Sequence, residues 1–90
     1  MFLKYKKELL KVLSKIGDIR LMEDFLSDLL TPAEIKDLVS RWRIIKLLNQ
    51  GFTQRQVAKT VGVSISKVER GAKEMLDKDG GFYKILKKFK

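Results

Sequence analysis

QRQVAKTVGVSISKVERGAKEM, residues 54–75, consists of two short amphipathic runs joined by a turn. Between the runs, Gly62 can adopt the left-handed conformation that ends a helix, and Ser64 can cap the next helix. A small residue at Ala58, a glycine four positions later and an apolar Val68 are together typical of a helix-turn-helix. The alternative is an ordinary αα-hairpin in a small helical bundle. The apolar positions at helical spacing are Val57, Ala58 and Val61 in the first run, and Ile65, Val68 and Ala72 in the second.

A long helix is predicted directly before this motif. Thr31 is placed to cap it, Pro32 occupies the first turn, where a missing N–H is harmless, and Glu34 completes a capping box. The helix should run to about Gln50. Its apolar side is broad, which is typical of a helix central to its fold, and Trp42 is expected to pack in the core.

The outer segments also read as helices. Residues 2–16 and 18–29 each carry an apolar stripe at helical spacing, and a short closing helix is expected within residues 81–90. The first of these stripes is broad for so small a chain, so we expect it to pack on a second copy rather than fold back on its own domain or lie on a membrane surface. The fold class is all-α with about six short helices in a single domain. Its parts are N-terminal dimerisation helices (1–30), a central helix (31–50), the helix-turn-helix (53–76) and a C-terminal helix (81–90).

The composition favours a polyanionic partner. Lysine and arginine number 20 against 11 acidic residues, which gives a net charge of +9 over 90 residues. Nucleic acid is the simplest partner for so basic a chain. Acidic side chains gather in residues 18–28, so that helix should face away from the polyanion.

Several function classes are disfavoured. The chain has no cysteine and no histidine, which removes disulfides, thiolate chemistry and the usual zinc ligands. Without those side chains an enzyme is not expected, nor are a metal site or a bound cofactor. No apolar run reaches the length of a membrane span, and the N-terminus lacks the apolar core of a signal peptide. We expect a cytoplasmic protein without a membrane partner.

Four local patterns occur together between Leu30 and Gly71. They are Leu-Thr-Pro before the long helix, Arg-x-Arg-Ile at residues 41–44, a glycine followed shortly by Thr-Gln-Arg, and Arg-Gly at residues 70–71. In this combination the run resembles the tryptophan repressor family of bacterial operon regulators. The resemblance is close over roughly half of the chain, and the flanking segments agree in helix order. It implies an intertwined homodimer that binds double-stranded operator DNA, with L-tryptophan as corepressor.

The resemblance also implies a ligand site. In the family two arginines sandwich the indole ring, and they match Arg41 and Arg70, whereas Glu74 departs from the small hydroxylated residue expected near the ligand amino group. This carboxylate could pair with the ammonium group, or it could neutralise Arg70 and fill the pocket. The remaining matches are Gly71, which leaves room beside the ring, Thr31 near the carboxylate, and Leu30, whose backbone faces the ammonium group.

A DNA-reading surface follows from the motif and the resemblance. Residues at the start of a recognition helix reach base edges, here Ile65, Ser66 and Glu69. Glu69 could accept from cytosine or be held by Lys73. Arg55 matches the family arginine that touches a guanine. The expected phosphate contacts are Thr53, Gln54, Lys59 and Lys67, the last in place of a small residue in the family.

Three functions remain in view. The first is a DNA-binding transcriptional repressor, regulating a tryptophan-related operon with L-tryptophan as corepressor. The second is a related DNA-binding regulator with no ligand or a different one. The third is a basic helical module that binds RNA or a protein, in which the helix-turn-helix is only architecture.

Overall fold

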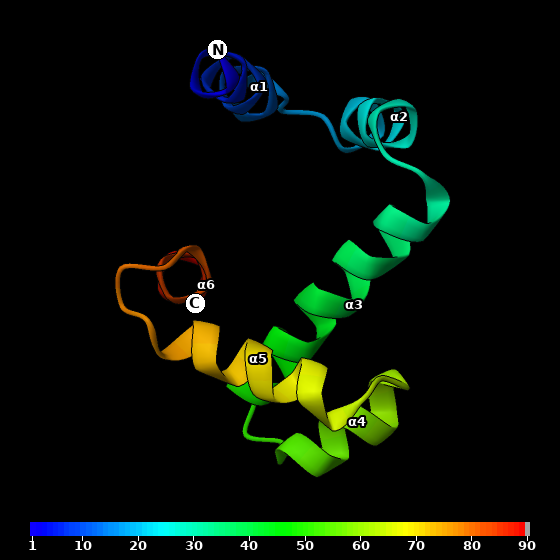
Figure 1. The fold of residues 1–90 in the computed structure, drawn as a ribbon, viewed down its shortest axis with the longest axis vertical. Helices are drawn as coiled ribbons and strands as arrows, with labels where there is room; N and C mark the ends of the chain where they lie inside the picture. The colour runs from blue at the N-terminus through cyan, green and yellow to red at the C-terminus, as the bar shows by residue number, and fades with distance from the viewer. Residues whose placement is uncertain (90) are drawn as a thin grey trace. The chain divides into compact units, whose positions relative to one another are not determined.

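The computed structural model describes residues 1–89, which form helices and no strand (Figure 1). This confirms the all-α class. The chain divides into two compact units, Met1–Ile35 and Lys36–Lys90, and the prediction of a single domain stays a prediction. Lys90, the last residue of the expected C-terminal helix, lies outside the described residues. The helices are α1 (Phe2–Lys15), α2 (Ile19–Leu29), α3 (Pro32–Asn49), α4 (Gln54–Val61), α5 (Ile65–Leu76) and α6 (Gly81–Lys88).

Side-chain caps start α2, α3, α4 and α5, and those of α3 and α5 are the ones that the sequence analysis predicts. At the start of α3 the Thr31 N–H donates to Glu34 Oε1 at 2.9 Å, and the Glu34 N–H donates to Thr31 Oγ1 at 3.2 Å. Hydrogen bonding from the Thr31 backbone and side chain lowers the pKa of the Glu34 carboxyl. Its contribution to stability is therefore present above the pKa of an unfolded glutamate and is lost as pH falls through the lowered value. Asp18 caps α2, and Ser64 caps α5.

The turn between α4 and α5 has the geometry expected from its glycine. Gly62 adopts a left-handed conformation with φ of 78°, where a side chain would be strained. The N–H groups of Gly62 and Val63 both donate to the Ala58 carbonyl oxygen, at 2.9 and 3.1 Å. At the other end of α4, Thr53 and Gln56 form a second capping box. These bonds give the stretch at residues 54–75 the conformation of a helix-turn-helix.

A small core holds the second unit together. Ile45, Val57 and Val68 are 1%, 0% and 0% exposed, and they come from α3, α4 and α5 respectively. Figure 1 shows α4 and α5 at the C-terminal end of α3, with α6 beyond the end of α5. The helix-turn-helix is therefore fixed to α3 by interlocking aliphatic side chains. Ile44 and Leu47 complete the buried set, and Leu48, Ala58, Val61, Val63, Met75, Phe82 and Leu86 pack partly buried against it.

Trp42 does not belong to that core. It is 41% exposed, so the prediction that it packs in the interior is wrong for the single chain. The three buried residues of α3 (Ile44, Ile45 and Leu47) lie near its C-terminal end, and only the face that meets α4 and α5 is covered. The apolar periodicity of α3 predicted the helix correctly. It did not predict how much of the apolar surface of α3 is covered by the same chain.

The first unit has no interior of its own. None of its residues is buried, and neither α1 nor α2 contributes a buried side chain. Large apolar side chains on α1 are open within the unit, for example Phe2 at 76% and Leu3 at 69%. A pair of helices with this much open apolar surface is not a stable fold by itself.

Candidate ligand pocket and nucleic-acid interface

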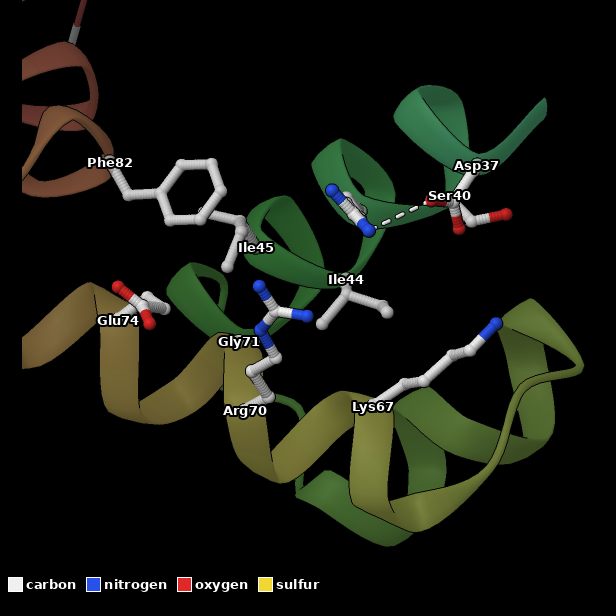
Figure 2. Close-up of a pocket in the computed structure, with 10 residues that line it drawn as sticks. Asp37, Ser40, Ile44, Ile45, Lys67, Arg70, Gly71, Glu74 and Phe82 are labelled. Atoms are coloured by element: carbon white, nitrogen blue, oxygen red, sulfur yellow. Dashed lines mark ion pairs between the residues drawn. The ribbon is translucent and has the colours of Figure 1, made fainter. Parts of the chain in front are cut away.

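A pocket of about 310 Å³ opens between α3 and α5 in the second unit (Figure 2). Its volume lies at the small end of the range for ligand sites, about 300–1,000 Å³, which suits a molecule of amino-acid size. Four of the residues predicted from the sequence to bind a ligand line it together. The lining residues are Asp37, Ser40, Arg41, Ile44 and Ile45 from α3, Lys67, Arg70, Gly71 and Glu74 from α5, and Phe82 from α6.

Charged groups surround an apolar floor in this pocket. Arg41 pairs with Asp37 one turn earlier on α3, at 2.9 Å, with both side chains about half exposed. In Figure 2 the Arg70 guanidinium points from α5 toward α3, in the direction of Ile44 and Ile45. Arginines on both helices therefore line the same pocket, as the family resemblance implied. An exposed ion pair contributes about 0–1 kcal/mol, so Asp37 orients Arg41 without locking it.

Gly71 lies where α5 comes closest to α3. A Cβ atom at this position would stand 3.1 Å from Ile44 Cγ2 and 3.3 Å from Ile45 Cδ1. Those distances are tighter than ordinary van der Waals contacts, so a side chain at this position would require the two isoleucine side chains to shift. The glycine thus serves the packing of the two helices, and its role in making room beside a ligand ring stays a prediction.

Leu30 and Thr31 are not among the residues that line the pocket. They belong to the first unit, Leu30 after the end of α2 and Thr31 at the cap of α3. The Thr31 side chain already serves the capping box. A ligand role for these two residues stays a prediction.

Phe82 and Asp37 are among the lining residues that the sequence analysis missed. Phe82 reaches the pocket from α6, and no local pattern predicts which face of that helix meets α5. Asp37 had a usable signal, because an acid four residues before a basic residue on a helix commonly pairs with it. Within residues 1–89 that pair is the only ion pair, so neither Arg70 with Glu74 nor Lys73 with Glu69 is joined.

A second, shallower hollow of about 600 Å³ adjoins α6. It is lined by Trp42, Glu74, Gly80, Gly81, Phe82 and Ile85, so Glu74 and Phe82 line both hollows. Trp42 thus contributes one wall of an open apolar surface rather than a core contact.

The residues predicted to contact DNA all lie on the helix-turn-helix and are exposed. Thr53 caps α4, and Gln54, Arg55 and Lys59 lie on that helix, while Ile65, Ser66, Lys67 and Glu69 lie on α5. Lys67 also lines the pocket, so its side chain borders both the pocket and the surface predicted to contact DNA. No side chain of this set is buried, and each is free to meet a partner.

Two further features are absent from the described residues. Among residues 1–89 no group of three acidic, histidine or cysteine side chains lies close enough to hold a metal ion. No helix in the same range is long and apolar enough to cross a membrane.

A helix-turn-helix fixed to a long helix, with a small charged pocket between them, defines the class of helix-turn-helix regulators. The model of the family described as Trp repressor protein matches residues 4–90. The chain therefore belongs to the Trp repressor family, which is a family of regulators, and it is a repressor of that type.

Curated relatives agree with this assignment. A Trp operon repressor homolog of Xylella fastidiosa (strain M23) is 43% identical over 70 residues, covering 77% of this chain and 76% of the relative. A Trp operon repressor homolog of Chlamydia trachomatis serovar D is 36% identical over 80 residues, covering 88% and 85%. One of Chlamydia caviae is 35% identical over 81 residues, covering 89% and 80%. No solved structure gives a significant match.

Proposed function

We propose that the protein is a homodimeric repressor that binds operator DNA through α4 and α5. We further propose that L-tryptophan, bound in the pocket between α3 and α5, acts as its corepressor. The observation that carries the second part is the pocket itself, which brings Arg41 and Arg70 from two helices to one cavity of amino-acid size. Planar guanidinium groups stack well on aromatic rings, so this pair suits an indole.

The DNA part rests on the exposed surface of the helix-turn-helix. The first turn of α5 presents Ile65 and Ser66, both exposed, where a recognition helix approaches base edges in the major groove. Basic side chains at Lys59 and Lys67 lie on the same two helices and supply phosphate-binding charge, while Arg55 on α4 is the candidate for a guanine contact. A net charge of +9 adds long-range attraction to the polyanion.

Arg55→Ala is expected to reduce operator affinity by roughly 1–3 kcal/mol and to relax specificity at one base pair, because it removes a bidentate base contact. Lys67→Ala should instead weaken binding to all sequences about equally and flatten the salt dependence, since it removes a phosphate contact. Fluorescence anisotropy with the operator and with point-substituted duplexes separates the two effects. Uniform loss across random duplexes for both variants would contradict the base-reading role of Arg55.

The ligand part is tested by calorimetric titration of L-tryptophan into the protein. We expect saturable binding with one site per chain. Arg70→Ala should remove this binding, because the indole ring loses the guanidinium group that stacks on one of its two faces. The Arg41–Asp37 ion pair favours a second candidate, a repressor of the same type without an amino-acid ligand, since Arg41 already has a partner. Absence of heat up to millimolar L-tryptophan, with operator binding intact, would establish that second candidate.

A further inference from the structure

Glu74 holds an unusual place among the charged groups of the pocket. It lies on the same stretch of α5 as Arg70 and Gly71, and it shares two hollows with the aromatic ring of Phe82. Figure 2 shows Glu74 and Phe82 together at one end of the pocket, with Lys67 at the other end. The two ends of the pocket therefore differ: the Glu74 carboxylate and the Phe82 ring share one end, whereas Lys67 lies at the other.

The other charges of the pocket leave this carboxylate available. Asp37 is paired with Arg41, so these two groups largely cancel each other. Glu74 forms no ion pair with a residue in the described range 1–89, although Arg70 stands one turn earlier on the same helix. An exposed, unpaired carboxylate at the edge of a cavity is held by solvent alone, and a ligand cation could replace that solvent.

A carboxylate beside an aromatic ring suits one kind of ligand group. A primary ammonium donates charge-assisted hydrogen bonds to the carboxylate, and its charge is attracted to the face of the ring. An anionic group in the same place would meet repulsion from Glu74. The chemistry of this end of the pocket therefore favours an organic cation.

We propose that Glu74 and Phe82 make the pocket a receptor for an organic ammonium group, so that arylalkylamines without a carboxylate are ligands of this protein. The proposal rests on the proposed function, since it assigns the ligand class of the same pocket. In an α-amino acid the carboxylate is attached to the same carbon as the ammonium group. Placing that ammonium on Glu74 brings the two carboxylates close together, and an amine without a carboxylate avoids this repulsion.

Three indole compounds separate the contributions of the two ligand charges. L-tryptophan carries both charges, tryptamine only the ammonium, and indole-3-propionate only the carboxylate. Calorimetric titration should show that tryptamine binds at least as tightly as L-tryptophan, and that indole-3-propionate binds roughly tenfold more weakly or worse. The net charge of +9 attracts anions, so a preference for the cation must come from the pocket rather than from the whole protein.

The variants Glu74→Gln and Glu74→Ser assign that preference to one residue. In both, tryptamine should weaken by roughly tenfold or more, because a charge-assisted contact is lost, while indole-3-propionate should gain. Asp79→Asn is the matched control, since it removes one carboxylate from the turn after α5 without touching either hollow. It should leave the order of the three ligands unchanged.

The outcomes distinguish this proposal from the proposed function. Binding of L-tryptophan without binding of tryptamine, or an order of ligands that Glu74→Gln leaves unchanged, would overturn the ammonium receptor and keep the corepressor site. Failure of all three compounds to bind the wild-type protein would overturn the ligand pocket, and the ammonium receptor with it. Loss of the cation preference in Glu74→Gln and Glu74→Ser, with Asp79→Asn unchanged, supports the proposal.

Discussion

Saturating L-tryptophan is expected to tighten operator binding by roughly 5–150-fold, which corresponds to a coupling free energy of about 1–3 kcal/mol. The physical reason lies in where the two arginines stand. Arg41 belongs to α3 and Arg70 to α5, so a ring held between them fixes the angle between the long helix and the recognition helix. Linkage requires operator DNA to raise the affinity for L-tryptophan by the same factor.

In a symmetric dimer that angle determines the separation of the two recognition helices. Helix-turn-helix dimers bind half-sites about 34–36 Å apart, a general value for which the Trp repressor is itself a standard example. A small rotation of α5 about its contact with α3 moves both reading surfaces at once. The packing of Gly71 against Ile44 and Ile45 gives a close hinge contact for such a rotation.

Arg41→Ala should abolish the response to L-tryptophan while leaving operator affinity without ligand nearly unchanged. Arg43→Ala is the matched control, because Arg43 is an exposed arginine on the same helix that lines neither hollow. Both variants lose one positive charge, so a difference between their responses to L-tryptophan is due to the position of Arg41 in the pocket and not to the charge alone. Operator anisotropy with and without millimolar L-tryptophan gives the measurement, and equal wild-type affinity in the two conditions would refute the coupling.

Local structure was predictable from the sequence because short-range chemistry decides it. The capping pairs of Thr31 with Glu34 and Thr53 with Gln56 are three residues apart, and Gly62 is the residue that a left-handed turn favours. Each of these features depends on neighbours within one turn. The helix starts, and the turn inside the helix-turn-helix, were therefore correct.

The walls of the pocket were less predictable because they depend on contacts between distant segments. Phe82 enters the pocket from α6, and its contribution follows from how α6 packs on α5. No spacing in the sequence encodes that packing. The same limit explains Trp42, because helical periodicity identifies an apolar face but not the surface that covers it. Arg41, Arg70, Gly71 and Glu74 were placed by family resemblance, and without it their roles had no signal.

Removing residues 1–16 is expected to leave a chain that aggregates, because the proposed dimer needs the first unit. The unit contains no buried residue, although α1 and α2 carry broad apolar faces. A second copy of the chain could cover these apolar faces, because a two-fold interface buries the same patch on both chains. Sedimentation at micromolar concentration should show a homodimer for the intact protein and a heterogeneous distribution for the shortened chain.

A pair of point variants makes this expectation sharper than the deletion. Leu9 lies on the apolar stripe of α1 and Lys11 on its polar side, so Leu9→Asp and Lys11→Asp introduce the same residue on opposite faces. A fully buried leucine contributes about 1.5–3 kcal/mol, and two-fold symmetry repeats that loss, so Leu9→Asp should weaken dimerisation by roughly 100-fold or more. Lys11→Asp should sediment as the intact dimer does. A well-folded wild-type monomer at micromolar concentration would rule out the dimer, because the open apolar faces of α1 and α2 would then need no second copy.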